Sequence, residues 1–131
     1  MRYMLTIVGH EGGRDDATPE EMQEEMGRWQ AFTDEIRASG AFIAGEGLAP
    51  SATATTIHIG DDGERTTTDG PFAETKEQLG GYYLLDCKDL DEALAWAKRI
   101  PMPGGTVEVR PVMDYEAAGI EGPDRVEASA S

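Results

Sequence analysis

The 131-residue sequence has little cysteine and no long apolar run, and each shortage excludes a class of protein. A single cysteine, Cys87, excludes an internal disulfide framework and a cysteine-based zinc site. It is compatible with a reducing compartment. No apolar stretch approaches the roughly 20 residues of a membrane-spanning helix, and the first residues do not resemble a leader peptide. We therefore expect a cytoplasmic protein with no membrane contact.

Basic residues are also scarce, with 11 Lys and Arg against 26 Asp and Glu and a formal net charge of −15. Nucleic-acid binding that is independent of base sequence relies on cations that replace counterions, so we expect no direct nucleic-acid partner. The two histidines, His10 and His58, form no His-x-x-x-His or His-Glu-x-x-His spacing, and no EF-hand pattern is present. The sequence thus predicts no metal site and no bound cofactor.

The chain does contain enough apolar residues, 39%, to bury the core of one domain. A Thr18-x-x-Glu21 capping box with Pro19 at the first helical position predicts a helix that ends at Gly40. Asp89 predicts a second helix start, with Pro101 as the stop. Strands are expected at residues 2–8, 41–48, 53–59, 64–68, 80–87 and 106–112, and residues 72–79 are expected to be irregular.

The apolar residues of the first helix recur at spacings of three and four, which is typical of a helix face packed on a core. They are Met22, Met26, Trp29, Phe32 and Ile36. The face expected for the second helix comprises Leu90, Ala93, Leu94, Ala97 and Ile100.

Two β-α-β halves joined by a β-hairpin predict a ferredoxin-like α+β fold, with one antiparallel sheet and both helices on one face. The other sheet face would stay wet in a lone chain, so we expect a two-fold homodimer. We expect one domain over residues 1–113. Residues 114–131 form an acidic tail, expected to be partly disordered or to wrap a neighbour.

Residues 69–81 read Asp-Gly-Pro-Phe-Ala-Glu-Thr-Lys-Glu-Gln-Leu-Gly-Gly. This string resembles the signature of the DGPF proteins, a branch of the YCII-related family. The resemblance extends over residues 1–113 and includes Tyr3-Met4-Leu5, the Gly45-Glu46-Gly47-Leu48-x-Pro50 segment and Val107-Glu108-Val109-Arg110-Pro111. It implies a dimeric α+β barrel.

The resemblance implies less about activity. Some distant YCII-like proteins are lyases or dehydrohalogenases of small aromatic compounds, and they use an Asp with a His on the first helix. The first helix here has no histidine, so that chemistry is not carried over. Many DGPF proteins are encoded beside extracytoplasmic-function sigma factors, which implies a regulatory association.

Two carboxylates are candidate acid–base groups. Asp69 precedes a long polar stretch with Lys76, and Glu46 lies between two glycines where an apolar strand ends, with Arg110 or Lys76 as an expected partner. Their other interpretation is structural: Asp69 as a turn residue and Glu46 in an ion pair. The expected ligand contacts are His10, Lys76, Tyr82 and Arg110. His58 alternates with two isoleucines and is expected to be exposed or dimer-facing, and Cys87 is expected to be structural.

Two functions remain open from the sequence. The first is a small protein that binds an organic molecule between sheet and helices, with acid–base chemistry of the lyase or isomerase type. The second is a non-enzymatic accessory protein whose acidic helix surface (Glu20, Glu21, Glu24 and Glu25) and tail dock on a basic partner such as a sigma factor.

Overall fold

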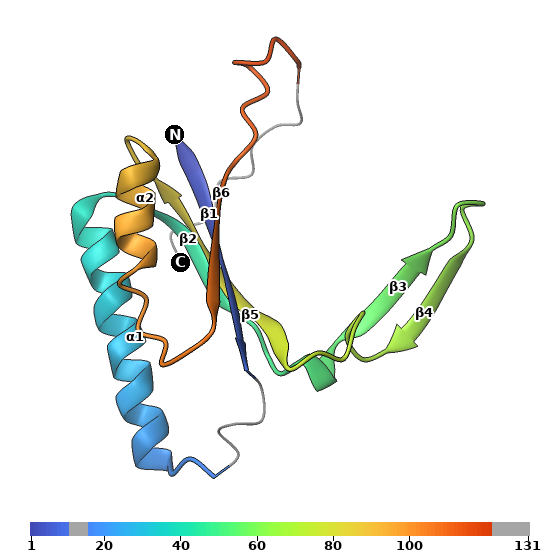
Figure 1. Ribbon diagram of the computed structural model, residues 1–131, viewed down its shortest axis with the longest axis horizontal. Coiled ribbons are helices and arrows are strands. Elements are labelled where there is room, and N and C mark those ends of the chain that lie inside the picture. Colours follow the sequence, from blue (N-terminus) through green and yellow to red (C-terminus); the bar gives the residue numbers. More distant parts are fainter. Residues whose placement is uncertain (11–15, 122–131) are drawn as a thin grey trace.

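The computed structural model describes residues 1–10 and 16–121. Its elements, in chain order, are β1 (Arg2–His10), α1 (Pro19–Ser39), β2 (Phe42–Gly47), the 3₁₀ turn η1 (Ser51–Thr53), β3 (Thr55–Ile59), β4 (Arg65–Asp69), β5 (Glu77–Asp86), α2 (Leu90–Ala97) and β6 (Thr106–Pro111). Four strands form an antiparallel sheet in the order β2-β5-β1-β6. Both helices lie on one face of this sheet, and the β3–β4 hairpin projects from the other side (Figure 1). The predicted ferredoxin-like α+β fold is confirmed.

The helix ends follow the local signals. The Thr18 hydroxyl accepts a hydrogen bond from the backbone N–H of Glu21 at 3.1 Å, and Pro19 begins α1. Gly40 ends it with a φ of 86°, a left-handed conformation that glycine adopts without a steric cost. The Asp89 carboxylate caps α2 through the N–H of Glu92. These caps confirm both predicted helix starts.

Helix α2 is shorter than predicted, because it ends at Ala97 and not at Ile100. The N–H groups of Arg99 and Ile100 bond carbonyls three residues back, which tightens the chain into a turn. Pro101 follows directly, and a residue before proline is disfavoured in the α conformation.

The core lies between the helices and one face of the sheet. Leu5 of β1, Leu85 of β5 and Ile36 of α1 are fully buried. Phe32 and Ala93 pack against them from α1 and α2, and Cys87 closes one end of the cluster. Side chains alternate along β1 and β5, so the residues between these buried positions point to the opposite face.

Two strands are longer than predicted. β1 continues to His10 and β5 begins at Glu77, because residues 8–10 pair with residues 77–79 beyond a register shift next to Ile7. The extension of β1 is Gly9-His10 and that of β5 is Glu77-Gln78-Leu79, so neither shows an apolar alternation. Apolar alternation therefore could not reveal them.

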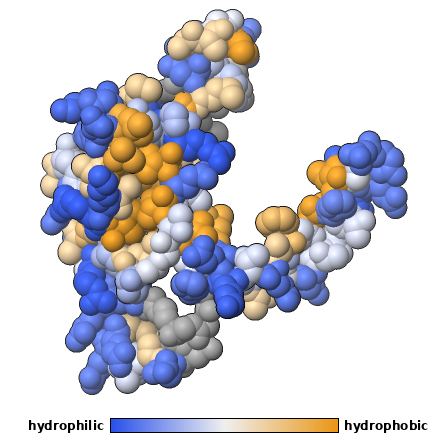
Figure 2. Space-filling model, in the orientation of Figure 1, coloured by the Kyte–Doolittle hydropathy of each residue, from blue (hydrophilic) through white to orange (hydrophobic). Residues whose placement is uncertain are grey.

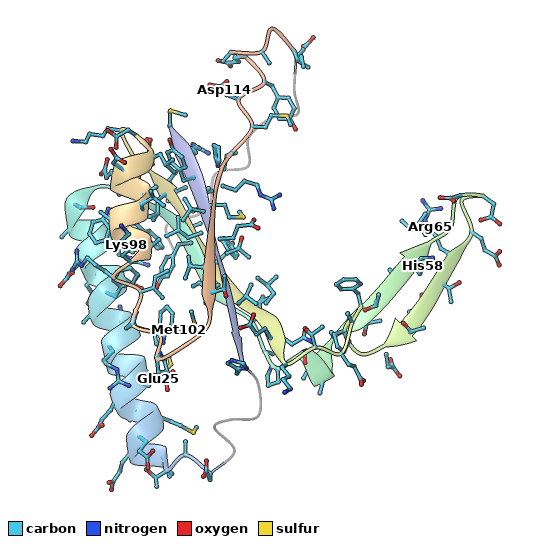
Figure 3. The ribbon with its side chains drawn as sticks, viewed as in Figure 1. Glu25, His58, Arg65, Lys98, Met102 and Asp114 are labelled. Atoms are coloured by element: carbon cyan, nitrogen blue, oxygen red, sulfur yellow. The ribbon has the colours of Figure 1, made fainter. Side chains whose placement is uncertain are left out.

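The β3–β4 hairpin, here called the arm, forms a separate two-stranded sheet. Its strands begin and end within about two residues of the predicted bounds. Figure 1 shows the arm extending away from the sheet, with open space between arm and body. His58 and Arg65 both belong to it (Figure 3), and both are exposed.

Part of the predicted tail is ordered into turns. Backbone bonds join Asp114 to Ala118 and Tyr115 to Ile120, and the Asp114 carboxylate accepts from the N–H of Ala117. The rest of the predicted tail, residues 122–131, lies outside the described residues, as do residues 11–15 of the first loop. Within the described part of the chain, no helix combines the length and apolar character needed to cross a membrane.

Candidate functional site

A pocket of about 860 Å³ lies between the first half of α1 and one end of the sheet. α1 has 21 residues and α2 only 8, so α1 extends beyond α2 and covers this end alone (Figure 1). The pocket therefore lies beside the core, in the same layer between helix and sheet.

Glycines at helix-facing positions leave this space open. Gly45 pairs with Tyr83 and Gly47 pairs with Gly81, so all four lie in two alternate rows of the sheet, on either side of the Glu46–Tyr82 row. Tyr83 packs on Phe32 of α1, which fixes these rows as helix-facing. Gly9 continues the helix-facing series of β1 past Ile7. Three strands thus present backbone where the core presents leucine.

These glycines are of two kinds. A Cβ on Gly45 would lie 2.8 Å from the Tyr83 ring, and one on Gly81 would lie 2.7 Å from the carbonyl oxygen of Glu46. Both positions are too tight for a side chain. Gly47 and Gly9 have ordinary room, with nearest atoms at 4.0 Å and 3.6 Å. Their lack of a side chain keeps the pocket empty rather than relieving a clash.

The wall of the pocket opposite the glycines is apolar and consists largely of methionine side chains. Met22, Met26 and Trp29 come from α1, and Met102 comes from the loop before β6. Figure 3 places Met102 and Glu25 on the same side of the molecule, and both line the pocket. The prediction that the whole apolar face of α1 is core is wrong for Met22 and Met26, which are 48% and 63% exposed. They line the pocket together with the strand glycines, and no side chain of residues 1–10 or 16–121 buries them.

Tyr83 separates the core from the pocket. Its ring lies 5.6 Å from Phe32, edge to face, and 6.5 Å from Trp29. Its hydroxyl is 2.7 Å from the hydroxyl of Thr33 on α1. Burial raises the pKa of Tyr83, and the hydrogen bond with Thr33 opposes part of that rise. Tyr83 is therefore a neutral hydrogen-bonding group at the back of the pocket.

His10 stands at the rim. It is the last residue of β1, pairs with Glu77 of β5, and lines the pocket. Its Nε2 lies 3.8 Å from the Glu77 carboxylate. Since Gly9 faces α1, alternation directs the His10 side chain to the sheet face that α1 does not cover.

Glu46 and Tyr82 also border the pocket, but they pair with each other in the row next to Gly45 and Tyr83. Alternation directs their side chains to the sheet face that α1 does not cover. Their backbone, and not the Glu46 carboxylate or the Tyr82 hydroxyl, faces α1. The predicted roles of these two side chains stay predictions.

The other three predicted site residues lie outside the pocket lining. Asp69 ends β4 opposite Thr55, in the arm. Arg110 of β6 pairs with Glu108 at 2.6 Å, which corrects the expected pairing with Glu46. Lys76 is exposed in the loop before β5. The structure thus gathers His10, Glu46 and Tyr82 around one pocket and leaves Asp69, Lys76 and Arg110 away from it.

In the described part of the chain, Cys87 and the metal-ligating residue types offer no second site. Burial raises the pKa of the Cys87 thiol to about 11, and the carboxylates of Glu92 and Asp86 add to the rise. Such a thiol is a poor nucleophile at neutral pH. Within residues 1–10 and 16–121, no group of three His, Cys, Asp or Glu side chains could hold a metal ion.

Comparison with known proteins identifies the class. The YCII-related domain model matches residues 1–116, so the chain belongs to the YCII-related family. One relative by sequence is an uncharacterized protein of Rhizobium meliloti (strain 1021), which is 47% identical over 72 residues. The match covers 53% of this chain and 57% of that protein, so the chain spans little more than half the length of this curated relative.

Proposed function

We propose that the protein binds a small, largely apolar organic molecule in the pocket between α1 and the sheet. The observation that carries this proposal is the glycine floor, by which we mean Gly9, Gly45, Gly47 and Gly81. At these helix-facing positions, three strands have no side chain. A pocket of about 860 Å³ is within the range of small-molecule sites, which are mostly apolar with a few placed polar groups.

The polar groups suit a ligand with one or two hydrogen-bonding atoms. The hydroxyls of Tyr83 and Thr33 bond each other within the lining, at the core side. A ligand whose apolar body lies on the glycines and against Met22, Met26 and Trp29 would reach these hydroxyls with a polar atom at its inner end.

Of the acid–base groups chosen from the sequence, Asp69 lies outside the pocket lining. Alternation places the side chains of Glu46 and His10 on the sheet face that α1 does not cover. We therefore propose ligand binding and assign no acid–base residue to this pocket.

Calorimetric titration with two neutral probes, 2-naphthol and cyclohexanol, tests the binding proposal. Gly47→Ile fills the floor at the position with room for a side chain, and we expect it to weaken probe binding at least about tenfold. Gly27→Ala is the matched control, because Gly27 lies on α1 away from the pocket lining and an added Cβ meets nothing within 4 Å. Equal affinities in the wild type and Gly47→Ile would contradict the proposal.

The same titration, with a salt-dependent pull-down beside it, separates the two functions. If the protein binds no neutral probe but retains a basic protein at low salt, the accessory function replaces the ligand-binding one.

A further inference from the structure

Arg37 gives the pocket between α1 and the sheet a positive charge at one end. Of the described residues that line this pocket, Arg37 is the one lysine or arginine. Its guanidinium carbon lies 4.6 Å from the centre of the Phe42 ring. Among residues 1–10 and 16–121, no ion pair includes Arg37. The pocket lining therefore contains a cation whose contact in the structure is an aromatic ring and not a carboxylate.

The acidic side chains closest to Arg37 along α1 have other partners. The Asp34 carboxylate accepts a hydrogen bond from Gln30 at 3.0 Å. The Glu35 carboxylate forms an ion pair with the chain segment that follows α2. Glu25 also lines the pocket, but it precedes Arg37 by 12 positions, or about 18 Å along the helix axis. The Arg37 end of the pocket is thus suited to an anion.

The contact with Phe42 orients the guanidinium. Phe42 begins β2 and packs edge to face on Tyr83, with ring centres 6.4 Å apart. A guanidinium over the face of an aromatic ring keeps the N–H groups of its planar fork free to donate. This fork matches the two oxygens of a carboxylate, which it binds through two parallel hydrogen bonds. Arg37 is therefore held in a state that is ready to bind such a group.

A hydroxyl donor lies on the same face of α1. Thr33 precedes Arg37 by four residues, so their side chains are neighbours on the helix surface. The hydroxyls of Thr33 and Tyr83 share one hydrogen bond of 2.7 Å. Each hydroxyl has one proton, so one proton forms that bond and the other remains available to an acceptor. This end of the pocket offers N–H and O–H donors, which suit a group that only accepts.

We propose that the ligand of this pocket is an amphipathic carboxylic acid whose carboxylate is bound by Arg37. This inference rests on the proposed ligand-binding function and names the class of ligand. A chain of net charge −15 repels anions at long range, so an acid must gain its affinity inside the pocket. One guanidinium balances the single charge of a carboxylate better than the larger charge of a phosphate monoester.

The distribution of charge along α1 sets the direction of the ligand. Glu20, Glu21 and Glu24 belong to the first turns of α1, where Figure 2 shows mostly hydrophilic surface. A carboxylate is repelled there and attracted to Arg37 in the last turn. The apolar body of the acid then lies between the glycine floor and Met26.

Calorimetric titration of the full chain with 2-naphthoate and 2-naphthamide tests the inference, because these probes share a ring system and differ in charge. The wild type should bind the acid at least about tenfold more tightly than the amide. Arg37→Gln should remove this preference and leave the amide affinity within about twofold of the wild-type value. Arg28→Gln is the matched control: it removes the same charge from an exposed position of α1 outside the lining, and it should keep the preference.

The outcomes separate this inference from the function on which it rests. If the amide binds as tightly as the acid, or if Arg37→Gln keeps the preference, the carboxylate assignment is overturned and ligand binding stands. A preference lost equally in Arg28→Gln would overturn it too, because the attraction would then be long-range. No binding of the acid, the amide or 2-naphthol would overturn both the assignment and the binding function.

A second variant keeps the test valid if the first does not fold. Circular dichroism of Arg37→Gln should match the wild type, since Arg37 is exposed and lies outside the core. Arg37→Lys keeps the charge but lacks the planar fork, so it should lower the preference for the acid at least about threefold. An unchanged preference in both variants would contradict the role of Arg37.

Discussion

The two ends of the layer between α1 and the sheet share one helix and one sheet but have opposite contents. At one end, Leu5, Leu85 and Ile36 meet and exclude water completely. At the other end, Met22 and Met26 face Gly47 and Gly81, and the same layer holds a pocket. The difference shows that the residue type at helix-facing strand positions, together with the cover from α2, decides whether helix and sheet form a core or a pocket.

The largest expected contrast is between substitutions at the two ends. Leu85→Ala should lower the free energy of unfolding by about 2–5 kcal/mol, because Leu85 is fully buried and leaves a cavity. Gly47→Ile adds a side chain in the pocket and should change it by less than about 1 kcal/mol. Urea unfolding measures both. A large loss in Gly47→Ile would mean that the pocket end is packed like the core.

The dependence of stability on high pH tests the burial of Cys87 at the filled end of the layer. The pKa of Cys87 is raised from 9.0 to about 11 in the folded chain, so the folded state keeps a proton that the unfolded chain releases above pH 9. The stability contribution is complete below pH 9 and is lost as the pH rises toward 11. Between pH 8 and 10.5 the ionisation of Cys87 should lower the free energy of unfolding by roughly 1–2 kcal/mol. Cys87→Ala should reduce the slope of stability against pH in that window by this amount; an unchanged slope would contradict the burial of the thiol.

Tyr83 tests the boundary between the two ends, with a smaller effect. Tyr83→Phe removes the hydroxyl that bonds Thr33 and should cost about 1 kcal/mol. Tyr82→Phe is the control, because Tyr82 lies on the opposite sheet face, and its effect should stay within about 0.5 kcal/mol. Equal effects in the two variants would mean that the Thr33 contact does not stabilise the fold.

The fold was predictable because its signals are local. The caps at Thr18 and Asp89 and the stop at Gly40 depend on neighbouring residues, and the structure places each where the sequence indicates. The extension of β1 to His10 was missed, because its partners in β5 are polar and show no apolar alternation.

The pocket was harder to predict because it depends on pairs that are distant in sequence. Met22 and Met26 continue the stripe of Phe32 and Ile36, and only the strands opposite them show that they face glycine. The signal that could have found it was present: Gly45, Gly47 and Gly81 occupy alternate positions of strands that were predicted from the sequence. Asp69 was chosen for its loop chemistry, but it belongs to the arm and not to the layer between helix and sheet.

The central claim is tested most directly by two-dimensional amide NMR of the wild type titrated with 2-naphthol. The account predicts that the backbone amides of Gly9, Gly45, Gly47, Gly80 and Gly81 shift together with the indole N–H of Trp29, since all of these residues line the pocket. The amides of Leu5 and Leu85 in the filled end should move little. Shifts confined to the arm or spread over the surface, with the pocket glycines unmoved, would contradict the account.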